Sequence, residues 1–153
     1  MREDEVTFSE LLKHLGSSTD SVESLKLATG YLNLMDSYKT HLFDLMKKDK
    51  NAKVDLLVAS PKANGFYKAG KVKKYIPGLY RLNALDLVKK ARKTGLQDQL
   101  RLKEYENGDW TYHAKGAWVY EKLAEDLCPE LPTMTVVGSS NFSYRSNRRD
   151  TEV

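Results

Sequence analysis

Short apolar segments alternate along the chain with longer segments whose apolar residues recur every three or four positions. Residues 25–32 and 54–59 are apolar runs of strand length, and the segment between them has the spacing of an amphipathic helix. Strands that alternate with helices commonly pair into one sheet with the helices packed on it. We therefore expect an α/β fold with a mixed sheet flanked by helices, in a single domain spanning residues 1–153.

Local signals set the expected boundaries of the other elements. Thr7 and Glu10 have the spacing of a capping box, which predicts a helix start, and Gly16 is a plausible stop. Asn33 is expected to cap the second helix, and Pro77 to begin a third helix that ends at Gly95. The apolar side of this third helix is expected to comprise Leu79, Leu82, Leu85, Val88 and Ala91. Further strands are expected over residues 100–105, 110–120 and 133–137.

The charge balance favours an anionic partner. Lys and Arg number 25 against 21 Asp and Glu, a net charge of +4, which is compatible with phosphate, nucleotide, nucleic acid or acidic lipid. The single cysteine, Cys128, forms neither an internal disulfide nor a thiol-based zinc site. No apolar run approaches the ~18 residues that cross a bilayer. The first residues, MREDEVTF, resemble neither a secretory signal nor an Arg-rich transit peptide.

A long connection follows the strand expected at residues 54–59. Connections of the length of residues 60–75 are uncommon in compact domains and are often functional. This segment carries five lysines, Lys62, Lys68, Lys71, Lys73 and Lys74. They are candidates to meet substrate phosphates or acidic lipid head groups, although a basic loop is more often simply solvated.

Two short segments carry the residues best suited to chemistry: His113-Ala114-Lys115 and Gly138-Ser139-Ser140-Asn141. If the first lies on a strand, alternation directs the His113 and Lys115 side chains to the same face. The second follows a strand as a turn of small polar residues, which offers hydroxyl, amide and backbone N–H groups to an anion.

These residue types suit a displacement at phosphorus. An imidazole attacks phosphorus or moves a proton near neutral pH, because its pKa lies in that range. A lysine neutralises the charge that builds on the non-bridging oxygens, and Ser and Asn donors fix the position of those oxygens. None of this chemistry requires a metal, and we expect no cofactor.

The two segments resemble the HKD motif of the phospholipase D superfamily, in which H-x-K is followed later by G-S-x-N. The resemblance makes His113, Lys115 and Asn141 the expected catalytic residues, and Ser139 and Ser140 the expected phosphate-binding residues. The chain departs from the motif where an aspartate is expected five residues after the lysine. Tyr120 stands at that position.

Longer segments are similar to one family of that superfamily, the mitochondrial-type CDP-diacylglycerol–glycerol-3-phosphate 3-phosphatidyltransferases. They are ATGYLNL (28–34), LLVASPKANGF (56–66), LKEYENGDWTYHAKG (102–116) and VVGSSNFSYRSNRRDTE (136–152). The resemblance implies a phospholipase D-like half-domain that transfers a phosphatidyl group from CDP-diacylglycerol to glycerol 3-phosphate, through a phosphohistidine intermediate. It also implies an acidic membrane surface as a partner, a mitochondrial location and no nucleic acid.

Enzymes of this family carry two HKD motifs in one chain. Neither His14 nor His41 begins an H-x-K, so this chain holds one motif, at residues 113–141, and we expect it to be a fragment that lacks the N-terminal half. The upstream histidine is often the nucleophile in the superfamily, so the resemblance assigns His113 the acid/base role. It also makes Glu152 the carboxylate that orients the histidine, and Arg145, Arg148 or Arg149 a candidate contact to glycerol phosphate.

Two other functions stay open on the sequence alone. The chain has about the length of single-motif phosphodiesterases or nucleases of the superfamily, which complete their site by homodimerisation. A non-catalytic domain that keeps the fold and binds acidic lipid is the third possibility.

Overall fold

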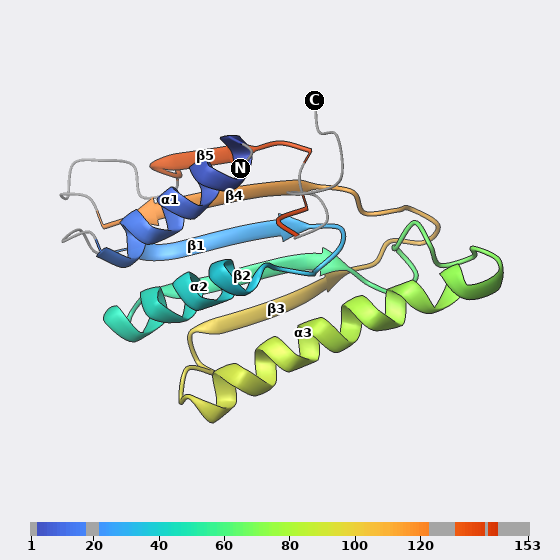
Figure 1. Ribbon diagram of the computed structural model, residues 1–153, viewed down its shortest axis with the longest axis horizontal. Coiled ribbons are helices and arrows are strands. Elements are labelled where there is room, and N and C mark those ends of the chain that lie inside the picture. Colours follow the sequence, from blue (N-terminus) through green and yellow to red (C-terminus); the bar gives the residue numbers. More distant parts are fainter. Residues whose placement is uncertain (1–2, 18–21, 123–130, 140, 144–153) are drawn as a thin grey trace.

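The computed structural model describes residues 3–17, 22–122, 131–139 and 141–143, and shows one sheet with helices packed against it (Figure 1). The elements are α1 (Glu3–Ser17), β1 (Val22–Thr29), α2 (Asp36–Lys48), β2 (Lys53–Ala59), the 3-10 helix η1 (Lys71–Tyr75), α3 (Ile76–Lys93), β3 (Leu100–Tyr105), β4 (Lys115–Glu121) and β5 (Met134–Val137).

The sheet has five strands in the order β3-β2-β1-β4-β5. β1 and β2 are parallel, as are β2 and β3, whereas β4 runs antiparallel to both β1 and β5. The expected α/β fold with a mixed sheet is therefore confirmed. The carboxyl ends of β1, β2, β3 and β5 and the amino end of β4 share one edge of the sheet, since β4 alone runs in the opposite direction.

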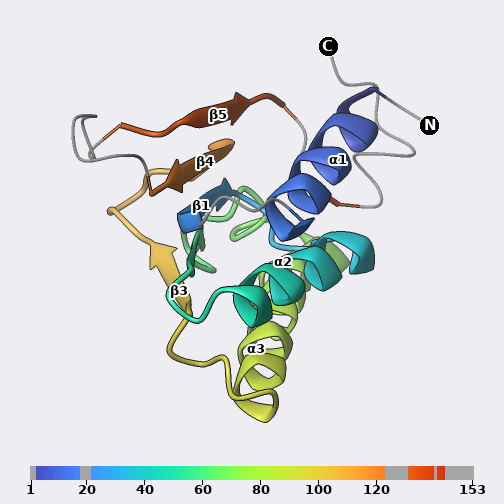
Figure 2. The ribbon, with the colours of Figure 1, turned by 90° about the vertical axis from the view of Figure 1, so that its left-hand side faces the viewer.

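The described helices all pack on one face of the sheet (Figure 2). The connection from β1 leads to its neighbour β2, and the connection from β2 leads on to β3, so both crossovers proceed in the same direction across the sheet, toward its outermost strand β3. Because such crossovers are nearly always right-handed, α2 and α3 must lie on the same side. α1 joins them through Phe8, Leu12 and Leu15, which belong to the same buried cluster.

The opposite face carries polar and aromatic side chains. Arg101, Asp55, Lys26 and Trp118 are neighbours in register across four strands of this face. Arg101 donates two hydrogen bonds to the Asp55 carboxylate, at 2.5 and 2.8 Å, and Lys26 Nζ lies 4.0 Å from the centre of the Tyr120 ring.

Helix starts differ from the sequence prediction. α1 already includes Glu3, so Thr7 lies inside the helix and the predicted capping box is wrong. α2 begins at Asp36 after Met35, and Asn33 does not cap it. The predicted helix end at Gly95 is confirmed to within two residues. α3 stops at Lys93, Gly95 follows with a φ of 72°, and its N–H donates to the Arg92 carbonyl at 3.2 Å.

The face that α3 buries differs in part from the prediction: Ala91 is buried and Val88 packs against the core, as expected. Ala84, Leu87 and Ala91 contact the core. Leu79, Leu82 and Leu85, which were expected to face the core, are exposed. None of the helices in the described part of the chain is long and apolar enough to span a membrane.

Candidate active site

Both predicted site segments lie at the edge of the sheet where β1 and β5 end and β4 begins. Thr29, the last residue of β1, pairs with Lys115, the first residue of β4. Gly116 pairs with Val137, the last residue of β5. The H-x-K segment and the turn after β5 are thus brought to one place by strand register.

His113 lies just before β4 rather than on it, because the strand begins at Lys115 and not at Trp110 as predicted. Its side chain is exposed. The preceding residue is anchored, since Tyr112 N–H donates to the Ala63 carbonyl at 2.8 Å and the Tyr112 ring stacks on Tyr105 at 4.9 Å between centroids. His113 therefore presents its imidazole to solvent from a backbone that the 60–75 segment holds.

Lys115 is buried, with 8% of its surface exposed. Its Nζ donates a hydrogen bond of 2.9 Å to the backbone carbonyl of His113. The ammonium group thus folds back along the H-x-K segment instead of extending into solvent. A cation held in this way places its charge next to the histidine that precedes it in the chain.

Gly30 and Tyr31, which directly follow β1, pack against this segment. A Cβ at Gly30 would lie 2.8 Å from the Tyr112 carbonyl oxygen and 3.5 Å from the His113 Cα, so a side chain there would displace backbone. The Tyr31 ring meets the His113 ring edge-on, with centroids 5.8 Å apart. Burial raises the pKa of the Tyr31 hydroxyl, which therefore stays protonated at neutral pH.

Sequence reasoning did not assign a role to Gly30 or Tyr31, although both lie in the ATGYLNL segment. A glycine directly after a buried strand is the available signal, because such glycines often mark a close approach of two backbones.

The turn after β5 is tied to the end of β1, to α1 and to the residue before α2, whose Met35 N–H donates to the Phe142 carbonyl at 3.2 Å. Thr29 Oγ1 lies 3.4 Å from the Asn141 backbone oxygen, and the buried Phe142 ring stacks on Phe8 at 4.5 Å. Phe142 has a φ of 58°, a conformation that is costly for a bulky side chain and that this packing holds. Ser139 is exposed and Asn141 is half-buried.

The remaining predicted residues lie outside the described part of the chain. They are Ser140, Glu152, Arg145, Arg148 and Arg149.

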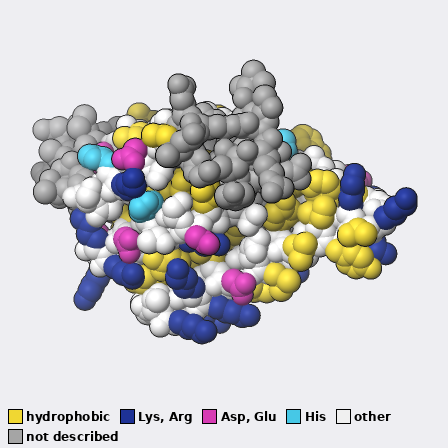
Figure 3. All heavy atoms as spheres, viewed as in Figure 1, with side chains coloured by type: hydrophobic (Ala, Val, Ile, Leu, Met, Phe, Trp, Pro, Cys, Tyr) yellow, Lys and Arg dark blue, Asp and Glu magenta, His cyan; other side chains and the backbone are white. Residues whose placement is uncertain are grey.

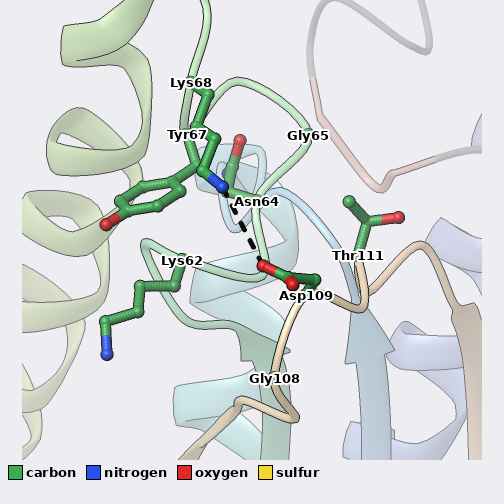
Figure 4. Close-up of a pocket in the computed structure, with 8 residues that line it drawn as sticks. All are labelled: Lys62, Asn64, Gly65, Tyr67, Lys68, Gly108, Asp109 and Thr111. Atoms are coloured by element: carbon green, nitrogen blue, oxygen red, sulfur yellow. Dashed lines mark ion pairs between the residues drawn. The ribbon is translucent and has the colours of Figure 1, made fainter.

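A polar pocket of about 480 Å³ lies beside the H-x-K segment and is shown in Figure 4. It is lined by Lys62, Asn64, Gly65, Tyr67, Lys68, Gly108, Asp109 and Thr111. Lys68 points toward Asp109, with Nζ and Oδ1 3.9 Å apart, whereas Lys62 extends away from this pair. Lys62 is bound by Glu106, whose pKa is lowered by hydrogen bonds from Lys62 and Ser60.

The chain is similar to phosphatidyltransferases over most of its length, although no protein-family model matches it. It is 40% identical over 126 residues to the Bos taurus protein named CDP-diacylglycerol--glycerol-3-phosphate 3-phosphatidyltransferase, mitochondrial. The aligned region covers 82% of this chain and 21% of the relative. It is 31% identical over 152 residues to the Dictyostelium discoideum protein named probable CDP-diacylglycerol--glycerol-3-phosphate 3-phosphatidyltransferase. Here the aligned region covers 99% of this chain and 24% of the relative.

A solved structure gives the same indication. The phosphatidylserine synthase of Haemophilus influenzae superposes with a TM-score of 0.56 and 28% identity, over 63% of this chain and 22% of that one. The resemblance expected from the motifs is therefore confirmed. The chain spans about a fifth of the length of the first curated relatives that it matches.

Proposed function

Because the chain is homologous to one segment of the CDP-diacylglycerol–glycerol-3-phosphate 3-phosphatidyltransferases, we propose that it forms part of an enzyme that transfers a phosphatidyl group from CDP-diacylglycerol to glycerol 3-phosphate. The observation that supports this most is the register of β1, β4 and β5. It gathers an exposed imidazole, a buried ammonium group and a polar turn at one edge of the sheet.

We propose a double displacement for the reaction. A histidine attacks the phosphorus next to diacylglycerol, a P–N bond forms, and the P–O bond to CMP breaks. A hydroxyl of glycerol 3-phosphate then attacks the same phosphorus, a second P–O bond forms, and the P–N bond breaks. His113 takes the proton of that hydroxyl in the second step and stabilises the leaving CMP by protonation in the first. The attacking histidine is supplied by the other half of the enzyme, outside this chain.

The other residues stabilise charge on the phosphoryl oxygens. Lys115 supplies a fixed positive charge, and Ser139, Ser140 and Asn141 supply hydrogen-bond donors. Glu152 is proposed to orient the His113 ring through its second nitrogen. The polar pocket beside Thr111 receives the hydrophilic part of a substrate, because it offers the Lys68 ammonium and the Asn64 amide.

Two further proposals concern the setting of the reaction. The donor is a membrane lipid, and both substrates are anions, so the enzyme works at an acidic membrane surface. The vertebrate relatives are named mitochondrial, and we propose the same location for this protein.

The test is to measure CMP release from CDP-diacylglycerol by the complete protein that contains this chain. We expect release that depends on glycerol 3-phosphate, with formation of phosphatidylglycerophosphate, and little release when glycerol replaces it. The 153-residue chain alone should be inactive, since it holds one H-x-K. CMP release at the same rate without any acceptor would instead indicate a phosphodiesterase, and no cleavage of CDP-diacylglycerol would refute the proposal.

A further inference from the structure

α3 carries apolar residues on two opposite sides. Ala84, Leu87 and Ala91 face the core. Leu79, Leu82 and Leu85 are exposed, and at 3.6 residues per turn they project roughly opposite to the buried residues. One apolar side is explained by packing on the sheet. The second is not, because no described element covers it.

The exposed apolar side continues onto η1. Val72 and Tyr75 are exposed, and with the three leucines of α3 they form a patch whose members show between 47% and 77% of their surface to solvent. Figure 3 shows hydrophobic side chains gathered over η1 and the first half of α3, with Lys and Arg side chains at both ends. We call Val72, Tyr75, Leu79, Leu82 and Leu85 the η1–α3 patch.

The charges around the η1–α3 patch are almost all positive. Residues 71–93 contain eight Lys and Arg against a single acidic residue, Asp86. At one end lie Lys71, Lys73 and Lys74, and at the other end lie Lys89, Lys90, Arg92 and Lys93. Asp86 lies 4.0 Å from Lys89 Nζ, so the acidic group also pairs within the segment.

We propose that the η1–α3 patch is the surface by which the protein docks on an anionic lipid bilayer. An amphipathic helix with leucines on one face and lysines around them lies in the plane of a membrane, with its apolar side at the boundary of the acyl chains. Lysines then hold the anionic head groups by Coulomb attraction. An apolar patch bordered by cations at both ends matches this partner better than it matches a second copy of a basic chain.

The position of the patch suits the lipid substrate, and this step rests on the proposed function. Tyr80 follows the exposed Leu79 and is half-buried, and its ring stacks on Tyr31 at 5.3 Å. Tyr31 in turn contacts His113 at 5.8 Å between ring centroids. The rings of Tyr80 and Tyr31 therefore connect the start of α3, where the bilayer would bind, to His113, which is proposed to act on a lipid phosphate.

Vesicle binding of the full 153-residue chain tests the proposal. The chain is sedimented with vesicles made of equal parts phosphatidylcholine and phosphatidylglycerol, and with vesicles of phosphatidylcholine alone. We expect clear preference for the anionic vesicles. The triple substitution Leu79→Gln, Leu82→Gln, Leu85→Gln should weaken partition by about tenfold or more, since each leucine contributes its buried apolar surface. Gln keeps the helix propensity, so circular dichroism should stay unchanged.

Matched variants separate apolar from electrostatic binding. Lys73→Gln with Lys74→Gln should weaken binding to anionic vesicles by roughly thirtyfold at low salt, at about 1 kcal/mol per lysine. Lys47→Gln with Lys50→Gln, one lysine in the last turn of α2 and one just after the helix, should have much less effect. Leu131→Gln removes a leucine that is 67% exposed far from the patch, and should leave binding unchanged.

Three outcomes would overturn the docking proposal: no vesicle binding, equal binding by the triple Leu variant, or equal binding to both vesicle types. If the triple Leu variant instead converted a dimer to a monomer in sedimentation velocity, the patch would be an interface between two copies. His113→Ala should not change vesicle binding, so failure of the docking surface and failure of the proposed reaction are distinguished.

Discussion

At the scale of single residues, the position of His113 depends on the glycine that follows β1. Gly30 brings its backbone so close to the 112–113 segment that a methyl group would enter the space of the Tyr112 carbonyl. The same approach lets Tyr31 reach the His113 ring and lets Gly65 sit beneath the Tyr31 hydroxyl. The imidazole is thus positioned by contacts from the residues that follow β1 and from the 60–75 segment.

Gly30→Ala tests this dependence. A Cβ 2.8 Å from the Tyr112 oxygen forces backbone to move, which we expect to lower the free energy of unfolding of the chain by about 1–3 kcal/mol. Displacement of His113 should lower kcat of the complete enzyme by about a hundredfold, because small misplacements of reacting groups are costly.

Gly16→Ala is the matched control for this experiment. Nothing lies within 4 Å of a Cβ at Gly16 in α1, and alanine favours the helix, so stability should rise slightly and kcat should be unchanged. Equal kcat in the Gly30 variant and the parent enzyme would show that this glycine does not position the histidine.

The chemistry-bearing residues could be found from the sequence because their types and order are unusual. His113 and Lys115 are separated in the chain from Ser139 and Asn141, and β-sheet register places the start of β4 beside the end of β5. The supporting contacts of Gly30 and Tyr31 could not be found in this way. They depend on which loop crosses the end of which strand, and that is a tertiary property.

At the scale of elements, the end of α2 is held by one buried side chain from the segment before β3. Gln99 is 6% exposed, and its Nε2 lies 2.9 Å from the carbonyl oxygens of Met46, Asp49 and Ala52. Carbonyls at a helix end lack intrahelical partners. This amide therefore contacts one carbonyl in the last turn of α2, that of Met46, and two in the connection to β2.

Gln99→Leu should destabilise the chain by about 1–3 kcal/mol, since it leaves buried carbonyls without a donor. Urea unfolding followed by circular dichroism measures this change. Gln97→Leu, at an exposed neighbouring position, should stay within about 0.5 kcal/mol of the parent. If both variants were equally stable, the α2 end would not depend on this amide.

The elements themselves were largely predictable, and the errors have physical causes. β2 was predicted with ends correct to one residue, because its apolar run lies between the polar Lys53 and Ser60. Both ends of β3 were predicted correctly. The predicted core side of α3 was wrong for Leu79, Leu82 and Leu85 and right for Val88 and Ala91, because the sequence of this helix supports two apolar faces. Leu79, Leu82 and Leu85 have the spacing of a core face, but the smaller Ala84 and Ala91 allow the close approach to the sheet.

At the scale of the whole molecule, the fold has two unlike faces. Helices cover one side of the sheet, whereas the other carries a shallow groove of about 480 Å³ bordered by residues such as Lys26, Leu57, Lys103 and Trp118. Strand order and right-handed crossovers together explain this arrangement. The sequence pattern indicates alternating strands and helices, but it does not show that both crossovers proceed in the same direction.

The turnover of a His113→Ala variant of the complete enzyme tests the proposed site most directly. CMP release from CDP-diacylglycerol in the presence of glycerol 3-phosphate should fall by about 10²–10⁴-fold, with no change in the free energy of unfolding, because the side chain is exposed. His14→Ala, at an exposed position on α1, should turn over like the parent. Parent-like turnover by the His113 variant would contradict the proposed site.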